Sequence, residues 1–358
     1  MDWIYTETEL FRHNSGDISL YHVFGLASTK SGCVMAFSEA RHGDGDDAGC
    51  THDIVLRVSR DNGSSFEPET VLIEGMPGQC LVNPVPLYDT GTGRMWLFYA
   101  DNFDNKRTDV YVMYTDDDAK TWSKPVCMNE TLKENDPVGH PVALPGPGHG
   151  ICLKNGRLIL PVWHRKYGVD VPAKERGYCV SALYSDDNGN SWQHTGCFAQ
   201  DILGNESRIA ENANGLIWII RPGNNLPTRY YMLSKDNGIS WTSPVLCQMN
   251  PANNCDDGVV SFNAGPGYED TLLVSRVTSM VKRFNMEILI SRDGGISFES
   301  VMELPHGDAM PGYSDLTIMP DGVVGLLHCR CNHVLFSRIS MQALTGGKFE
   351  NSTRKVWM

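Results

Sequence analysis

The sequence predicts an all-β fold of the β-propeller class, and three observations lead to this prediction. An eight-residue motif occurs five times along the 358 residues. Between its copies, short apolar or alternating runs are separated by clusters of Gly, Asn, Asp and Pro, as is typical of short strands. No stretch shows the periodicity of an amphipathic helix.

The repeated motif first occurs as SRDNGSSF, and its aspartates are 49 to 70 residues apart. This spacing is typical of propeller blades rather than of helical solenoids, whose repeats run roughly 33–47 residues. Only the second copy is degraded, with Thr115 in place of Ser and Ala119 in place of Gly. The five copies are Ser59–Phe66, Thr115–Trp122, Ser185–Trp192, Ser234–Trp241 and Ser291–Phe298.

Each copy of the motif has the composition of a turn that stabilises a β-hairpin through its own side chains. Its Asp can accept hydrogen bonds from backbone N–H groups of its own turn, and its Gly permits a positive φ. The Trp or Phe at its end can pack back into the sheets. The motif therefore indicates a scaffold and contributes none of the candidate catalytic groups below.

Composition and charge narrow the classes of partner. The 30 Lys and Arg against 43 Asp and Glu give a net charge of -13, which argues against a nucleic-acid or anionic-membrane partner. No apolar run approaches the roughly 18–20 residues of a membrane span. We expect a cytoplasmic protein, or a secreted or periplasmic one if a signal was removed. The oligomeric state is left open.

The 11 cysteines form no CxxC pair, which suits a reducing compartment and small residues of the core. One group invites a different interpretation, because alternation would place Cys329, Cys331 and His333 on one face of a strand. Three such ligands could hold zinc. A core strand with thiols inside is the favoured interpretation, so no metal is predicted.

The motif resembles the Asp-box, S-x-D-x-G-x-[ST]-[WF], of sialidases and of several unrelated propellers. Segments between the boxes resemble retaining exo-α-sialidases in order and spacing, among them MAFSEAR, NPVPLYDTGTGRMWLFY and GPGHGICLKNGRLILPVWH. The resemblance implies a single six-bladed β-propeller domain over residues 1–358, closed by pairing N- and C-terminal strands in one blade. It also implies sialylated glycans as substrates and no cofactor.

The resemblance further implies a tyrosine nucleophile. The anomeric carbon of a sialic acid bears a carboxylate, which would repel an Asp or Glu nucleophile, whereas a phenol stays neutral until a neighbouring base deprotonates it. MPGYSDLTIMPDGVVGLL resembles the tyrosine segment and assigns the nucleophile to Tyr313. GNESRIAENANGLIWIIRPGNN resembles the segment that supplies the activating glutamate, here Glu206.

Two arginines are implied as ligands of the substrate carboxylate. The glutamate segment also contains Arg221, which ends a strand before Pro222. KRFNMEILISRDGG resembles the segment that supplies the second, Arg283, although Arg276 is close enough to compete.

The general acid and base is implied in the loop EARHGDGDDAGC. The family spacing from Arg41 selects Asp47, with Asp46 and Asp44 as alternatives, and Arg41 would support the acid. A Gly- and Asp-rich loop is equally typical of a solvated turn or a calcium loop.

The chain departs from the family pattern at its third arginine. Sialidases carry Phe-Arg-Ile-Pro near the N-terminus, but here LYHVFGL places His22 at the position of that arginine. Histidine has fewer donors and is charged only near or below a pKa of about 6.5, so we expect weaker carboxylate binding, an acidic pH optimum or a shifted substrate. Alternatively, His22 only packs and another cation such as Arg12 takes the role.

Together, these residues imply an exo-α-sialidase that hydrolyses terminal α-linked sialic acids with retention. Two alternatives remain open. One is a glycosidase for a related sugar such as a deaminated sialic acid or Kdo. The other is a non-catalytic propeller that binds sialoglycans.

Overall fold

The computed structural model describes residues 3–262, 268–279, 282–304 and 312–347. Its strands form six antiparallel sheets, five of them four-stranded and one five-stranded. The first three sheets in chain order contain β2 (Ile18–Ser28), β3 (Val34–His42), β4 (His52–Ser59) and β5 (Thr70–Ile73); β6 (Leu81–Tyr88), β7 (Met95–Phe103), β8 (Arg107–Thr115) and β9 (Val126–Cys127); and β10 (Val142–Pro145), β11 (Ile151–Cys152), β12 (Leu158–Arg165), β13 (Tyr178–Ser185) and β14 (Gln193–His194).

The other three sheets complete the chain. They contain β15 (Gly204–Asn212), β16 (Gly215–Pro222), β17 (Tyr230–Ser234) and β18 (Val245–Leu246); β19 (Gly258–Ser261), β20 (Leu272–Val277), β21 (Met286–Ser291) and β22 (Glu299–Leu304); and β23 (Ser314–Ile318), β24 (Val324–Arg330), β25 (His333–Ile339) and β1 (Tyr5–Arg12). The helical segments described are α1 (Asn129–Lys133), the 3-10 turn η1 (Ala173–Glu175) and α2 (Met341–Leu344).

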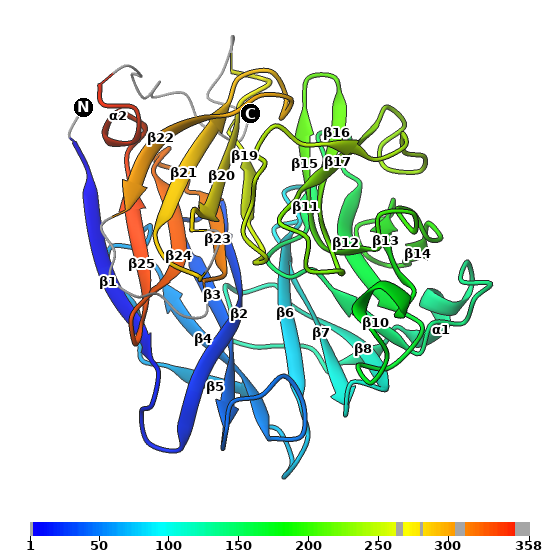
Figure 1. Ribbon diagram of the computed structural model, residues 1–358. Coiled ribbons are helices and arrows are strands. Elements are labelled where there is room, and N and C mark those ends of the chain that lie inside the picture. The colour runs from blue at the N-terminus through cyan, green and yellow to red at the C-terminus, as the bar shows by residue number, and fades with distance from the viewer. Residues whose placement is uncertain (1–2, 263–267, 280–281, 305–311, 348–358) are drawn as a thin grey trace.

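The six sheets are arranged as the blades of a propeller. The first strand of each sheet contacts the neighbouring sheets, so that β2 meets β6 and β23, β6 meets β10, and β19 meets both β15 and β23. β15 also contacts β12 and β13, which closes the ring. In Figure 1 the N-terminal strand β1, in blue, lies beside β25 near the other end of the chain, and the two pair antiparallel. The predicted six-bladed β-propeller is therefore confirmed.

The Asp-boxes have the hydrogen bonds that their sequence predicts. In the first, the Ser59 hydroxyl bonds the Asp61 carboxylate at 2.7 Å, and that carboxylate accepts the Ser65 backbone N–H at 2.9 Å. The degraded copy keeps the pattern, because Thr115 Oγ accepts the Ala119 N–H at 3.1 Å. Ala119 tolerates a φ of +67° where the other boxes have glycine.

The aromatic residue at the end of a box also joins neighbouring blades. The Trp192 ring lies 4.9 Å from the Phe98 ring of β7, and the Phe66 ring lies 5.0 Å from the Phe336 ring of β25. A Cβ on Gly63 would lie 2.4 Å from Phe336, so this glycine is needed for contact between blades as well as for its φ of +73°.

The alternative zinc group of the sequence does not assemble on one strand face. Cys329 is buried in β24, but Cys331 is exposed in the turn after it, with a φ of +51°. The His333 Nδ1 bonds the Glu9 carboxylate at 2.6 Å. A turn separates the three residues, so the alternation that the zinc interpretation required is broken, and the favoured core position holds only for Cys329.

No helix within the described part of the chain is long and apolar enough to cross a membrane.

Candidate active site

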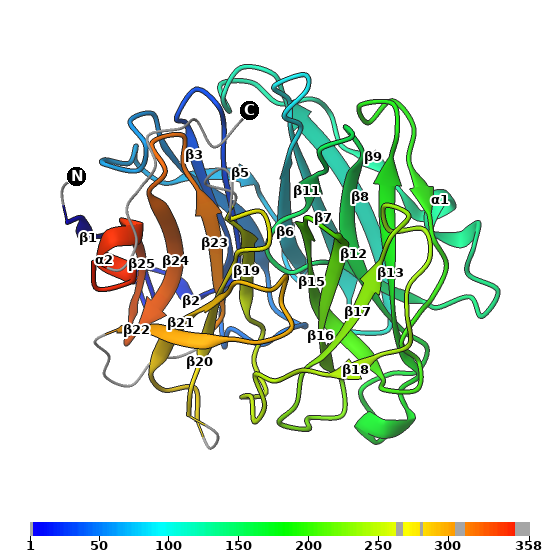
Figure 2. The same ribbon diagram turned by 90° about the horizontal axis from the view of Figure 1, so that it is seen from above.

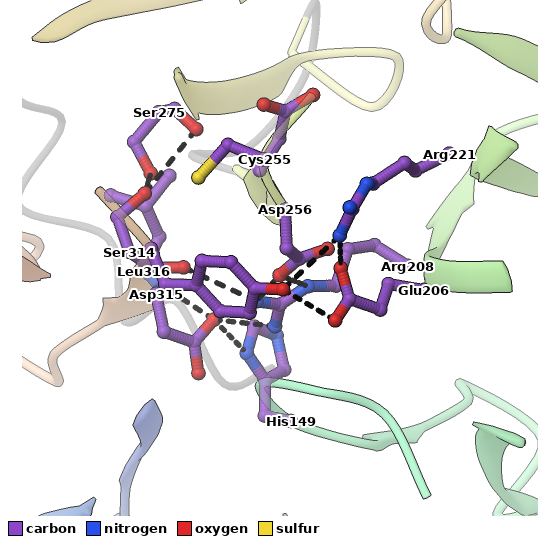
Figure 3. A network of polar contacts seen from close by, with 12 residues as sticks. His149, Glu206, Arg208, Arg221, Cys255, Asp256, Ser275, Ser314, Asp315 and Leu316 are labelled. Carbon is purple, nitrogen blue, oxygen red and sulfur yellow. Dashed lines mark hydrogen bonds and ion pairs between the residues drawn. The ribbon is translucent and has the colours of Figure 1, made fainter. Parts of the chain in front are cut away.

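Tyr313 meets Glu206 and Arg221 although it comes from a different blade: Glu206 and Arg221 lie on the paired strands β15 and β16 of one sheet. Tyr313 precedes β23, Glu206 lies in β15 next to a shift in register with β16, and Arg221 lies near the end of β16. The Tyr313 hydroxyl donates to one Glu206 oxygen, and Arg221 Nη1 donates to the other. Arg221 Nη1 also lies 3.1 Å from the Tyr313 hydroxyl. Figure 3 shows Glu206 facing Arg221, with a dashed line joining them.

The surroundings of Tyr313 keep its phenol protonated at rest. Its side chain is buried, and this burial together with the Glu206 charge raises its pKa well above 10. The Arg221 and Arg283 guanidinium groups act in the opposite direction. The Tyr313 hydroxyl therefore keeps its proton at rest, and Glu206, the base that would remove it, already accepts its hydrogen bond.

Arg221 and Arg283 lie on either side of one asparagine. Arg221 Nε donates to the Asn254 side-chain oxygen at 2.9 Å, and Arg283 Nη2 donates to the Asn254 backbone oxygen at 3.3 Å. The Arg283 guanidinium lies over the Tyr313 ring, 5.4 Å from its centroid. Arg276 instead pairs with Glu287 at 2.8 Å, which favours Arg283 of the two arginines that the sequence left in competition.

Arg41 brings the candidate acid loop to the end of β3. Arg41 Nη1 bonds the Asp47 carboxylate at 2.6 Å, and its Nη2 lies 2.6 Å from the buried Glu39 carboxylate. Asp44 instead accepts the backbone N–H of Asp46 at 3.3 Å. Among the three aspartates, Asp47 is the one whose described contacts include Arg41.

Arg41 also controls the charge of Asp47. Desolvation acts to raise the pKa of Asp47, but the side chain is 79% exposed, so water limits this effect. The Arg41 guanidinium acts in the opposite direction and leaves the pKa below its usual value. Asp47 is therefore ionised in the resting site.

His22 lies within this group of residues. Its ring is 4.4 Å from the Tyr313 ring, at a shift in the pairing of β2 with β3 where Val23 has a φ of +54°. The side chain is buried, and its Nδ1 has no hydrogen-bond partner among the described residues. His22 thus presents a polar atom beside the candidate nucleophile.

The surroundings of His22 disfavour the charged imidazole on which the expected acidic pH optimum depended. Burial, followed by the positive charges of Arg41 and Arg283, lowers the pKa of His22 well below 6.5. The imidazole is therefore neutral, and the expected acidic pH optimum loses the basis that a charged His22 would give it. Arg12 does not take its place, because it is exposed and paired with Glu9 at 2.9 Å.

A buried network beneath Tyr313 was missed by the sequence analysis. Arg208 lies between two carboxylates, with Nε 3.0 Å from Asp256 and Nη1 3.0 Å from Asp315. Asp315 also meets the His149 ring at 2.9 Å, as Figure 3 shows. A Cβ on Gly148 would lie 0.9 Å from Arg208 Nη1, so the guanidinium requires glycine there. The available signal was spacing, because Arg208 and Asp315 each follow a candidate catalytic residue by two positions.

A cavity of about 470 Å³ lies away from these residues. Its lining includes Lys30, Tyr88, Lys154 and Glu211, and none of the seven candidate residues. The convergence of polar groups, rather than cavity size, therefore locates the candidate site.

Known proteins resemble this chain in both sequence and fold. A family model described as a BNR repeat-like domain matches residues 32–329. A sialidase of Bacteroides fragilis is 26% identical over 361 residues, covering 92% of this chain and 64% of the Bacteroides protein. Sialidase-3 of Mus musculus is 28% identical over 258 residues, covering 64% of this chain and 59% of the mouse protein. The chain thus spans less than two thirds of either relative.

Two solved structures extend the likeness. The Hadza microbial sialidase Hz136 has a TM-score of 0.80 and 25% identity, covering 91% of this chain and 67% of that one. An intramolecular trans-sialidase from Ruminococcus gnavus has a TM-score of 0.77 at 17% identity, covering 94% of this chain and 98% of that one. The second likeness concerns the fold alone.

Proposed function

The chain belongs to the family of BNR repeat-like domains, and from this premise we propose that it is an exo-α-sialidase, a glycoside hydrolase acting on sialylated glycans. The observation that carries the proposal is the contact of Tyr313 with Glu206 and Arg221. A phenol that is hydrogen-bonded to a carboxylate base suits attack on an anomeric carbon that carries an anionic substituent. The sialidases among the relatives support the same activity.

In the proposed reaction, the leaving group departs as a neutral alcohol. Asp47 protonates the glycosidic oxygen while Glu206 removes the proton of Tyr313. The Tyr313 oxygen forms a bond to the anomeric carbon as the glycosidic bond breaks. Asp47 then deprotonates a water that displaces Tyr313, whose oxygen recovers its proton from Glu206. Two displacements at one carbon give net retention.

Recognition of the substrate carboxylate would use two guanidinium groups and one neutral ring. Arg221 and Arg283 lie beside Tyr313, and each offers a charged hydrogen-bond donor. The His22 Nδ1, which has no partner among the described residues, can add a neutral hydrogen bond. The carboxylate would therefore be bound with one positive charge fewer than by three arginines.

The state of Asp47 sets the pH dependence that we expect. Its acid role needs the protonated form, whereas Arg41 lowers its pKa in the resting site. An anionic substrate beside Arg41 would offset part of that effect. We therefore expect kcat/KM to decrease as pH rises towards neutrality, and this trend comes from Asp47 rather than from His22.

The direct test is hydrolysis of the 4-methylumbelliferyl α-conjugate of N-acetylneuraminic acid between about pH 4 and 7. We expect fluorophore release that is fastest at the acidic end, and proton NMR should show the α-anomer as the first sugar released. The first release of the β-anomer would contradict retention. Absence of hydrolysis, tested in parallel with deaminated and Kdo conjugates, would contradict the sialidase assignment. Binding of sialosides without turnover of any conjugate would instead indicate a binding module.

Replacement of His22 by arginine tests the carboxylate site. We expect a KM lower by roughly tenfold or more, because a hydrogen bond to a charged group contributes about 1.5–3 kcal/mol. His333→Arg is a matched control, since His333 bonds Glu9 on β1 and takes no part in the site. If His22→Arg unfolds at the same temperature as the wild type and keeps its KM, His22 does not contact the carboxylate.

A further inference from the structure

One face of the five-stranded sheet carries an unusual set of thiols and imidazoles. Cys179 lies near the start of β13, opposite His164 of β12, so the two side chains share a face. Antiparallel pairing of Val180 with Phe198 brings Cys197 diagonally beside Cys179. Side chains alternate along each strand, so Cys197 joins the same face. Cys179 and His164 are buried, and Cys197 is half-buried.

The segment between α1 and β10 adds a histidine whose orientation is fixed. His140 Nδ1 meets the Asp136 carboxylate at 2.8 Å, and the other Asp136 oxygen accepts the His140 backbone N–H at 2.6 Å. Both side chains are nearly inaccessible, with 4% and 5% exposure. The ring therefore turns its Nε2 toward the sheet, 3.7 Å from Cys179 Sγ.

The spread of these ligand atoms and one nitrogen–sulfur distance fit a single tetrahedral metal ion. The ligand atoms of His140, Cys179 and Cys197 all lie within 4.8 Å of one another. With Zn–N near 2.0–2.1 Å and Zn–S near 2.3 Å, a tetrahedral angle separates nitrogen from sulfur by about 3.6 Å. The observed 3.7 Å between His140 Nε2 and Cys179 Sγ agrees with that separation.

We propose that His140, Cys179 and Cys197 form a site for Zn²⁺ or a similar soft divalent ion. Asp136 would act as the carboxylate that orients the metal-binding histidine, as is usual around protein zinc. Binding would displace the two thiol protons and leave two thiolates and one neutral imidazole on the metal. The site is independent of the proposed hydrolysis.

His164 is a candidate for the fourth ligand. Asp136, His140 and His164 form a second group whose ligand atoms lie within 4.8 Å of one another. His164 Nε2 is 2.6 Å from the Ser181 hydroxyl, while its Nδ1 is buried without a hydrogen-bond partner among the described residues. His164 or a bound water would complete four-coordination.

The metal would fasten a peripheral segment to its blade. Figures 1 and 2 both place α1 and β13 on the side of the molecule opposite β1 and β25. The segment that follows α1 is also held by Asn135, whose amide donates to the His194 carbonyl at 2.5 Å. The metal would join three segments: β13 through Cys179, the segment after β14 through Cys197, and the segment after α1 through His140. Its role is therefore structural rather than catalytic.

The first experiment uses Co²⁺ as a spectroscopic probe. The full chain is reduced with a phosphine, freed of metal with a chelator and titrated with Co²⁺ alone. We expect about one Co²⁺ per chain, a thiolate-to-metal charge-transfer band and tetrahedral visible bands, all removed by Zn²⁺. A fully reduced chain that gives no charge-transfer band would overturn the proposal.

Variants then identify the ligands by affinity and spectrum rather than by activity. Cys179→Ser and Cys197→Ser should each weaken the charge-transfer band and lower Zn²⁺ affinity at least about 100-fold, and Asp136→Asn should lower it roughly 10- to 100-fold. Cys127→Ser is the matched control, because Cys127 is exposed on β9 and should leave binding unchanged. An equal effect of Cys127→Ser would contradict the site. So would a chain that contains a Cys179–Cys197 disulfide as isolated and still binds no Co²⁺ once that disulfide has been reduced.

Discussion

Tyr313→Phe should reduce kcat for sialoside hydrolysis by roughly 10³- to 10⁶-fold, the range seen when a nucleophile is removed from a catalytic unit. The substitution deletes one oxygen, which donates to Glu206 and lies 3.1 Å from Arg221 Nη1. The ring that packs against His22 and Arg283 remains. We therefore expect folding and substrate binding to persist while covalent attack is lost.

Two measurements separate this role from a structural one. Incubation with a 2,3-difluorinated sialic acid should add one sugar mass to the wild type and none to Tyr313→Phe. Tyr99→Phe is the matched control, because Tyr99 is a buried tyrosine of β7 stacked on Tyr111 with ring centroids 5.4 Å apart. Hydrolysis by Tyr313→Phe at the wild-type rate would remove Tyr313 from the mechanism.

Arg208→Met should lower the free energy of unfolding by about 3–5 kcal/mol, as expected when one partner of a buried ion pair is removed. Methionine fills much of the space but leaves the Asp256 and Asp315 carboxylates without their guanidinium. Urea unfolding followed by tryptophan fluorescence measures the difference. Arg12→Met, at an exposed pair with Glu9, should change the same quantity by at most about 1 kcal/mol.

The loss in Arg208→Met should also depend on pH. Removing the guanidinium raises the pKa of both buried carboxyls in the folded variant, so each binds its proton at a higher pH than in the wild type. Protonation removes the unpaired charge, and the deficit relative to the wild type should therefore shrink as pH falls. A deficit below about 1 kcal/mol at neutral pH would show that the network does not stabilise the fold.

Features that depend on local chain chemistry could be predicted from the sequence. The Asp-box hydrogen bonds join residues two to four positions apart, as in the contacts of Asp61 with Ser59 and Ser65. Their recurrence predicted the blades. That Arg41 lies beside its aspartate loop could likewise be anticipated from their closeness in sequence, whereas the choice of Asp47 within the loop came from the resemblance to sialidases.

Contacts between distant segments could not be predicted in this way. Arg208 meets Asp256 and Asp315, 48 and 107 positions away. The places of Arg208 and Asp315, each two positions after a candidate catalytic residue, mark them as neighbours of the site but do not say that they pair. The Cys and His residues that lie close in sequence, around Cys329, are separated by a turn. Those that assemble, His140, Cys179 and Cys197, come from three segments that strand pairing brings together.

The sequence by itself determined the propeller and the residue types at the candidate site, including histidine where the related pattern has arginine. Tertiary structure decided the charges of those residues. Burial beside Arg41 and Arg283 makes His22 neutral, whereas Arg41 keeps the exposed Asp47 ionised. The physical reason is that a pKa depends on desolvation and on neighbouring charges. Both are set by how the six blades pack around the site.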